Sequence, residues 1–208
     1  MKRIIVALMA VAVAFTSVFA EDAEAKEKEK KKLPSSPKYF TNLAMAKKEA
    51  EKYEAPIFVA VVGKGTPIEA AVKKVMSHKF FKELATKGFF VYTMRVDISK
   101  KEFEADKRTP KALFEKLSDD DQALLDVICV KDQARRLPIF GMVTHDAKEA
   151  KIKPVDMPRP PRPGTTYIGE YLQGLQSAAQ AYGIDIDMSK DMRKYIENPP
   201  PEKNKKKK

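Results

Sequence analysis

The sequence predicts an α/β fold in which helices cover both faces of a mixed sheet. Three apolar runs have the length of buried strands, and segments with apolar residues at helical spacing lie between them. Strands that are apolar along their whole length are typical of a sheet that is covered on both faces. The order of elements is helix, strand, helix, strand, helices, strand, strand, helix, which favours a sheet between two helical layers.

The first half of the folded part contains two predicted strands, over residues 57–62 and 89–96. Thr41 is expected to cap the helix that precedes the first strand, because its hydroxyl can accept a hydrogen bond from the first turn. A second helix is predicted from about Pro67. Ser77 is expected to cap a further short helix before the second strand.

The second half begins with two predicted helices. Thr109-Pro110 is a good helix start, since proline suits the first turn. Ser118 is followed by three aspartates, which the helix dipole favours near an N-terminus. The remaining predicted elements are a strand over 139–143, a returning strand over 149–155, and a last helix that starts at Thr165 or Thr166 and ends at Gly183.

The N-terminal residues predict export. Met1–Arg3 is basic, Ile4–Ala20 is an apolar segment of 17 residues, and acidic residues follow, as in a secretory signal cleaved after Ala20. The alternative is an uncleaved anchor, although a membrane-spanning helix needs roughly 20 residues. We therefore expect a periplasmic or secreted protein with no stable membrane span after cleavage.

Composition divides the chain into four parts. These are a signal peptide over 1–20, a charged disordered linker over 21–38, one folded domain over 39–197, and a lysine-rich disordered tail over 198–208.

The formal charge of +11 does not indicate a nucleic-acid partner, because no basic stripe with interleaved aromatic residues accompanies it. Five lysines lie in residues 198–208. They allow weak contact between the tail and an anionic cell envelope. The single cysteine, Cys129, has no partner for an internal disulfide and lies on an apolar helical face, which favours a buried side chain.

Other motifs give weak signals. Gly63-Lys64-Gly65-Thr66 follows a strand as a phosphate loop does, but it lacks the earlier glycine of that motif. The two histidines, His78 and His145, are predicted to be solvated surface residues. No metal site, cofactor, or catalytic acid, base or nucleophile is expected.

Four segments resemble the thioredoxin-like superfamily, in particular its exported single-domain members. They are Ala50–Val59, Lys74–Phe81, Phe89–Asp97 and Arg136–Phe140. The resemblance covers about residues 40–183. It implies a thioredoxin-like three-layer sandwich in which Pro138 is the cis-proline that begins a strand.

The chain departs from that family at its redox centre. Gly65 and Ile68 stand where the two cysteines of Cys-x-x-Cys would be, and thiol–disulfide exchange needs a reactive thiolate with a resolving thiol. The sequence therefore predicts a non-catalytic polypeptide-binding or scaffold module. In the family, the residue before the cis-proline offers its backbone to an extended substrate, and here that residue is Leu137. The predicted peptide-binding residues are Gly65, Thr66, Pro67, Ile68, Leu137 and Pro138.

Two alternatives remain open. Cys129 is a possible reactive thiol that acts with the thiol of a partner, which would make the protein a redox enzyme. The other alternative is a purely structural subunit.

Overall fold

The computed structural model describes residues 32–99, 101, 111–128, 137–152, 156–158 and 167–198. The backbone divides into two units, residues 1–30 and residues 31–208, and all described residues belong to the second. The predicted signal peptide, Cys129 and most of the lysine-rich tail lie outside the described residues.

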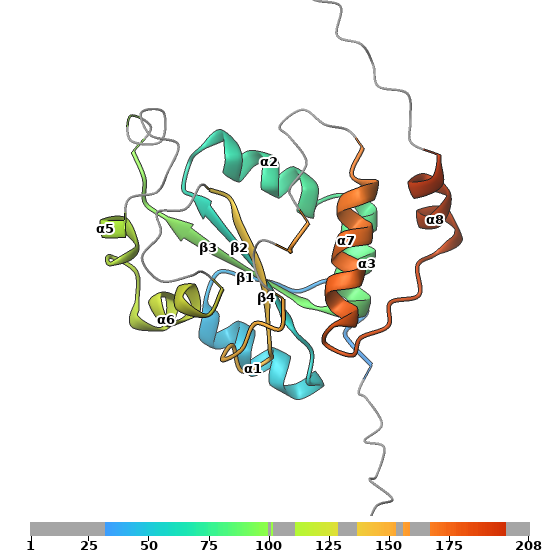
Figure 1. Cartoon of the computed structure of the whole chain (residues 1–208), viewed down its shortest axis with the longest axis horizontal. Coiled ribbons are helices and arrows are strands. Elements are labelled where there is room, and N and C mark those ends of the chain that lie inside the picture. Colours follow the sequence, from blue (N-terminus) through green and yellow to red (C-terminus); the bar gives the residue numbers. More distant parts are fainter. Residues whose placement is uncertain are drawn as a thin grey trace, which may run out of the picture. The chain divides into compact units, whose positions relative to one another are not determined.

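The second unit contains a mixed sheet (Figure 1). Its order is β1-β3-β2-β4, with β1, β3 and β2 mutually parallel and β4 antiparallel to β2. The register pairs Ile57 with Phe90, and Val61 with Ile139. The strands are β1 (Tyr39–Phe40), β2 (Ile57–Gly63), β3 (Phe90–Val96) and β4 (Ile139–Val143).

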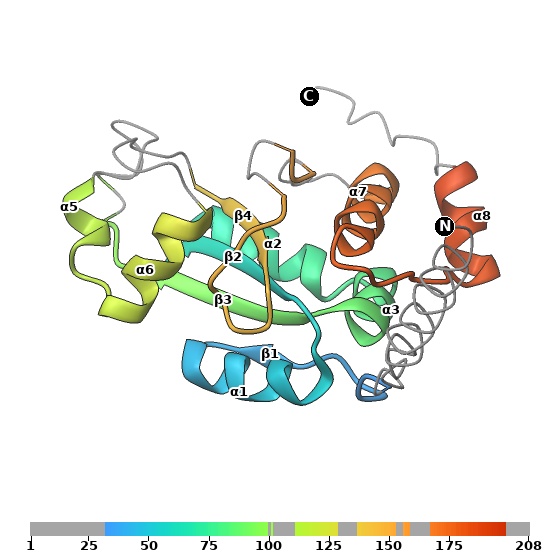
Figure 2. The ribbon, with the colours of Figure 1, turned by 60° about the horizontal axis from the view of Figure 1, so that its bottom comes forward.

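Helices cover both faces of the sheet, so the predicted α/β fold is confirmed. One face carries α1 (Leu43–Tyr53), α5 (Lys111–Phe114) and α6 (Asp119–Ile128). The other carries α2 (Pro67–Met76), α3 (Lys79–Gly88), α7 (Gly169–Gln180) and α8 (Lys190–Glu197). Figure 2 shows α1 and α7 on opposite sides of the sheet.

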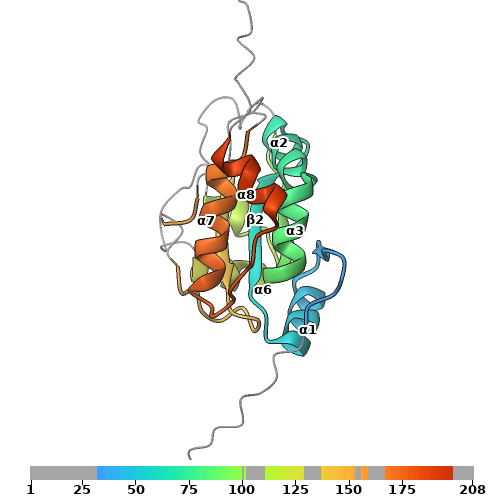
Figure 3. The same cartoon turned by 90° about the vertical axis from the view of Figure 1, so that its right-hand side faces the viewer.

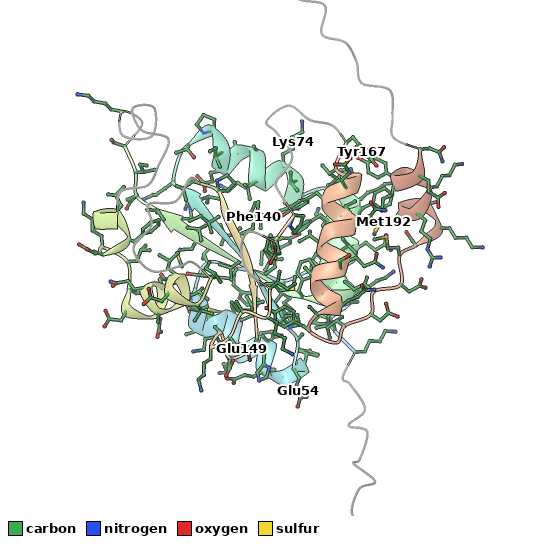
Figure 4. All side chains as sticks on the ribbon, viewed as in Figure 1. Glu54, Lys74, Phe140, Glu149, Tyr167 and Met192 are labelled. Atoms are coloured by element: carbon green, nitrogen blue, oxygen red, sulfur yellow. The ribbon has the colours of Figure 1, made fainter. Side chains whose placement is uncertain are left out.

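The core on the α2–α3–α7 face is built around Phe58 of β2, which is fully buried. Its ring centroid lies 5.9 Å from that of Phe81, 5.6 Å from Phe89 and 5.4 Å from Phe140. Such distances are typical of aromatic pairs that contribute beyond their buried area. Phe140, labelled in Figure 4, also contacts α7 through Tyr171, with 5.9 Å between the ring centroids.

The first helix begins one residue later than expected. Asn42, not Thr41, is the N-cap of α1, and its Oδ1 accepts a hydrogen bond from Met45 N at 3.0 Å. Thr41 and Asn42 are both favourable N-cap residues, and the N-cap is Asn42 because the helix begins at Leu43.

The cap of α3 also differs from the prediction. His78, not Ser77, precedes the helix, and its Nδ1 accepts a hydrogen bond from Phe80 N at 3.3 Å. Its ring lies 5.5 Å from that of Tyr195, and burial lowers the pKa of His78. His145 is half-buried as well. The prediction of a solvated surface residue is therefore wrong for His78, whose ring packs against Tyr195, whereas the intermediate exposure of His145 does not contradict it.

The predicted returning strand is replaced by a side-chain contact. Residues 149–152 form no strand, and residues 153–155 of that prediction lie outside the described residues. The Tyr182 hydroxyl donates a hydrogen bond to Met142 O of β4 and accepts one from Lys151 N at 2.9 Å. One tyrosine thus joins β4 to the following segment where backbone pairing was expected.

Two elements, β1 and α8, were not predicted, and both contact residues that are distant in the sequence. In β1, Tyr39 pairs with Val91, and the preceding Lys38 carbonyl accepts a hydrogen bond from Val91 N. Leu33 also packs against the core, so the domain's contacts begin within the predicted linker.

Within the described residues, no helix is long and apolar enough to cross a membrane.

Helix α8 lies beside α7 (Figure 3). Polar and apolar contacts together hold it in place. Ser189 caps α8, and its Oγ donates to Glu83 of α3 at 2.9 Å. Met192 is fully buried and lies beside α7 (Figure 4). The helix ends at Glu197, the last residue of the predicted domain.

Gly141 in β4 permits close packing of α6. A Cβ atom at this position would lie 2.7 Å from Ile128 Cγ2. We expect Gly141→Ala to lower the free energy of unfolding by about 1–3 kcal/mol, because the added methyl overpacks the core. Urea denaturation measures this loss. The loss should shrink in an Ile128→Ala background, which lacks Cγ2, and persist in an Ile128→Val background, which retains it. Equal losses in both would contradict the assignment.

Candidate functional site

The turn from β2 into the first residues of α2 holds Gly65 and Ile68, the positions that the sequence resemblance compares with a pair of cysteines. Gly65 adopts a φ of +73°, a left-handed conformation that glycine tolerates best. Thr66 is the N-cap of α2, and Pro67 occupies the first turn, where its fixed φ suits a helix. The local sequence therefore encodes a tight turn followed at once by a helix.

Hydrogen bonds within the turn close the N-terminus of α2. The Thr66 hydroxyl donates to Gly63 O at 2.8 Å and accepts from Glu69 N at 3.3 Å. Gly65 N donates to Glu69 Oε2 at 2.7 Å. This arrangement is a variant of the capping box, in which the acidic side chain reaches the residue before the cap. The amides of Gly65 and Glu69 are thus already bonded within the turn.

Glu69 is the buried charge of this region, with only 5% of its surface exposed. Its Oε1 lies 2.8 Å from Arg95 Nε and 3.1 Å from Lys73 Nζ, as close ion pairs without the alignment of hydrogen bonds. Burial alone would raise the pKa of Glu69. The Gly65 amide and the two cations outweigh burial, so the pKa lies below its usual value.

Leu137 and Pro138 precede β4 and lie beside this turn. The bond between them is cis, which is the conformation that the resemblance implies. A Cβ atom placed on Gly63 would lie 3.4 Å from Leu137 Cδ1, so the end of β2 contacts the start of β4. The structure therefore brings together the two segments that contain the predicted peptide-binding residues.

The predicted binding residues differ in accessibility. Gly65 and Pro67 are exposed, and Ile68 and Pro138 are half-buried. The side chains of Thr66 and Leu137 are buried, the first in the helix cap and the second in the core. These two residues have only backbone atoms to offer a partner. Cys129, the possible reactive thiol, lies outside the described residues.

A pocket of about 320 Å³ was missed by sequence reasoning. It lies among β1, β3, α2 and α3, whereas Leu137 lies on the β4 side of β2. The signal for it is in β3, where Thr93 and Arg95 are the less buried residues of the strand. The pocket is lined by Tyr39, Thr41, Val62, Glu69, Val72, Lys73, Met76, Ser77, Lys82, Thr93 and Arg95.

Neither metal chemistry nor a known relative assigns a function. Among the described residues, no group of His, Cys, Asp or Glu side chains is arranged to hold a metal ion. No protein-family model matches the chain, and neither a curated protein nor a solved structure matches it significantly.

Removing the Thr66 hydroxyl should destabilise the turn. We expect Thr66→Ala to lower the free energy of unfolding by about 0.5–2 kcal/mol, the usual cost of a lost N-cap. Thr66→Ser retains the oxygen and should lose clearly less in the same urea titration. Equal losses would mean that the methyl group's packing, not the cap, stabilises the turn.

Glu69 should make stability depend on pH in the acid range. Because its pKa is lower in the folded state, the stabilisation is complete above the ordinary value of 4.5 and is lost as pH falls through the folded pKa. Glu69→Gln should lower stability at pH 7 and flatten its decline between pH 5 and pH 3. The control is Glu51→Gln at an exposed position of α1, which should leave the decline unchanged. Unchanged acid sensitivity in the Glu69 variant would contradict the prediction.

Proposed function

We propose that this protein is a thioredoxin-like domain without a redox centre, which binds an extended polypeptide at the edge formed by Leu137 and Pro138. The observation that carries the proposal is the contact between this edge and the turn at Gly63–Ile68. Strand order supports it too, since a parallel β1-β3-β2 set with an antiparallel β4 fits the family's sheet.

Thiol chemistry is not part of the proposal. Neither Gly65 nor Ile68 carries a nucleophile. At the start of α2, where a thiolate would be stabilised, the Gly65 amide is bonded to the Glu69 carboxylate and the Glu69 amide to the Thr66 hydroxyl. Because Gly65 and Ile68 carry no nucleophile, we propose non-covalent binding at this site.

Binding would use backbone pairing as its main source of affinity. An extended segment that runs beside Leu137 can pair with its backbone as an added strand does. The exposed Pro67 and the half-buried Ile68 would then lie under the segment's side chains. Because neither residue is charged, the site would favour apolar side chains in the bound segment.

Export remains part of the proposal. The basic start and the apolar segment over residues 4–20 support a secretory signal. The partner would then be a polypeptide that the protein meets in the periplasm or outside the cell.

Photo-crosslinking tests the position of the binding edge. A benzoylphenylalanine at position 67 should crosslink β-casein, an unfolded polypeptide, several-fold more than one at Met45, which is 62% exposed on α1. Unmodified casein peptides should reduce the yield of crosslinked β-casein. The same peptides with alternate N-methylated amides should not reduce it, because N-methylated peptides cannot pair as strands. Equal crosslinking at both positions, or equal competition by both peptide sets, would overturn the proposal.

A further inference from the structure

We propose that the pocket between β3 and α2 binds a small carboxylate with a compact apolar body, of the size of a medium-chain fatty acid. This site lies on the opposite side of β2 from the Leu137 edge. The inference therefore stands independently of polypeptide binding.

The apolar part of the pocket is rigid. Val62, Val72 and Met76 are buried, with 0%, 5% and 8% of their surface exposed. Tyr39 stands at the edge of the pocket, and its hydroxyl donates to Met76 O at 2.9 Å. These side chains belong to β2, α2 and β1, which the core already holds in place. The pocket is therefore formed before any ligand enters, which limits the entropy lost on binding.

The charged part of the pocket favours an anion. The pocket is lined by three cations, Lys73, Lys82 and Arg95, and by one carboxylate, that of Glu69. Arg95 and Lys73 are both ion-paired with Glu69. Lys82 is exposed and has no ion-pair partner among the described residues. The pocket therefore carries an excess of positive charge, with Lys82 available to a ligand.

Glu69 also limits which anion fits. Its buried carboxylate repels a second negative charge, and the repulsion grows with the charge of the ligand. A phosphate ester or a nucleotide would carry about two charges or more at neutral pH. A monoanion that meets Lys82 and Arg95 with its carboxylate makes charge-assisted hydrogen bonds and keeps this repulsion smallest.

The volume sets the size of the ligand. At about 320 Å³, the pocket lies at the small end of the roughly 300–1,000 Å³ range of ligand sites, so it suits a small ligand such as a short fatty acid. Octanoate has that size. Its chain can lie against Tyr39 and the small exposed surface of Val72 and Met76, while its carboxylate stays at the basic edge.

Isothermal titration calorimetry with three probes tests the chemistry. Octanoate should bind with a stoichiometry of one, at least tenfold more tightly than octan-1-ol, which has the body without the charge, and acetate, which has the charge without the body. If octanol binds as tightly as octanoate, the basic edge has no role and the proposal fails. Absence of any octanoate binding overturns it as well.

Two variants test the location. Lys82→Gln should weaken octanoate binding several-fold, whereas Lys48→Gln on α1 should not, and neither should shift the melting temperature. Thr93→Phe should abolish binding because its ring fills the pocket, with far-UV circular dichroism to show that it folds. Equal affinity of the Lys82 and Lys48 variants would place the binding elsewhere.

Discussion

The arrangement of the domain depends on the complete burial of β2. All seven of its residues are buried, so both its faces and both its edges must be covered. Strands β3 and β4 satisfy its backbone hydrogen bonds, and the two helical layers cover its side chains. This requirement places β2 inside the sheet, between β3 and β4, and between the two helical layers.

Glu69 connects that turn to the neighbouring strand. A buried carboxylate is costly to desolvate, and it is retained only where hydrogen bonds and opposite charges compensate. Here the compensation comes from Gly65 within the turn, from Lys73 one helical turn onward, and from Arg95 on β3. The same carboxylate thus caps α2 and fixes the helix against the sheet.

Sequence reasoning was accurate where an element depends on local interactions, and it was less accurate where the element depends on contacts far apart in the chain. Strand 139–143 was predicted with its observed bounds, because an apolar run is a local signal. Helix α8 does have local signals, with Ser189 as its cap and Asp191 in its first turn, and sequence reasoning missed them. Strand β1 gave no local signal, because it relies on Val91 far along the chain. The returning strand failed for the same reason, since the Tyr182 hydroxyl lies 40 residues from its partner Met142.

The candidate site was predictable to the same degree. The spacing of Thr66 and Glu69 indicates a capping box from the sequence alone. Nothing in the local sequence shows that Glu69 also pairs with Arg95, in addition to Gly65 and Lys73. That ion pair is what places a basic side chain at the edge of the pocket. An anion that enters the pocket meets the guanidinium that already holds Glu69. The Arg95 guanidinium therefore has two roles. It stabilises the turn through Glu69, and it would attract an anionic ligand to the pocket.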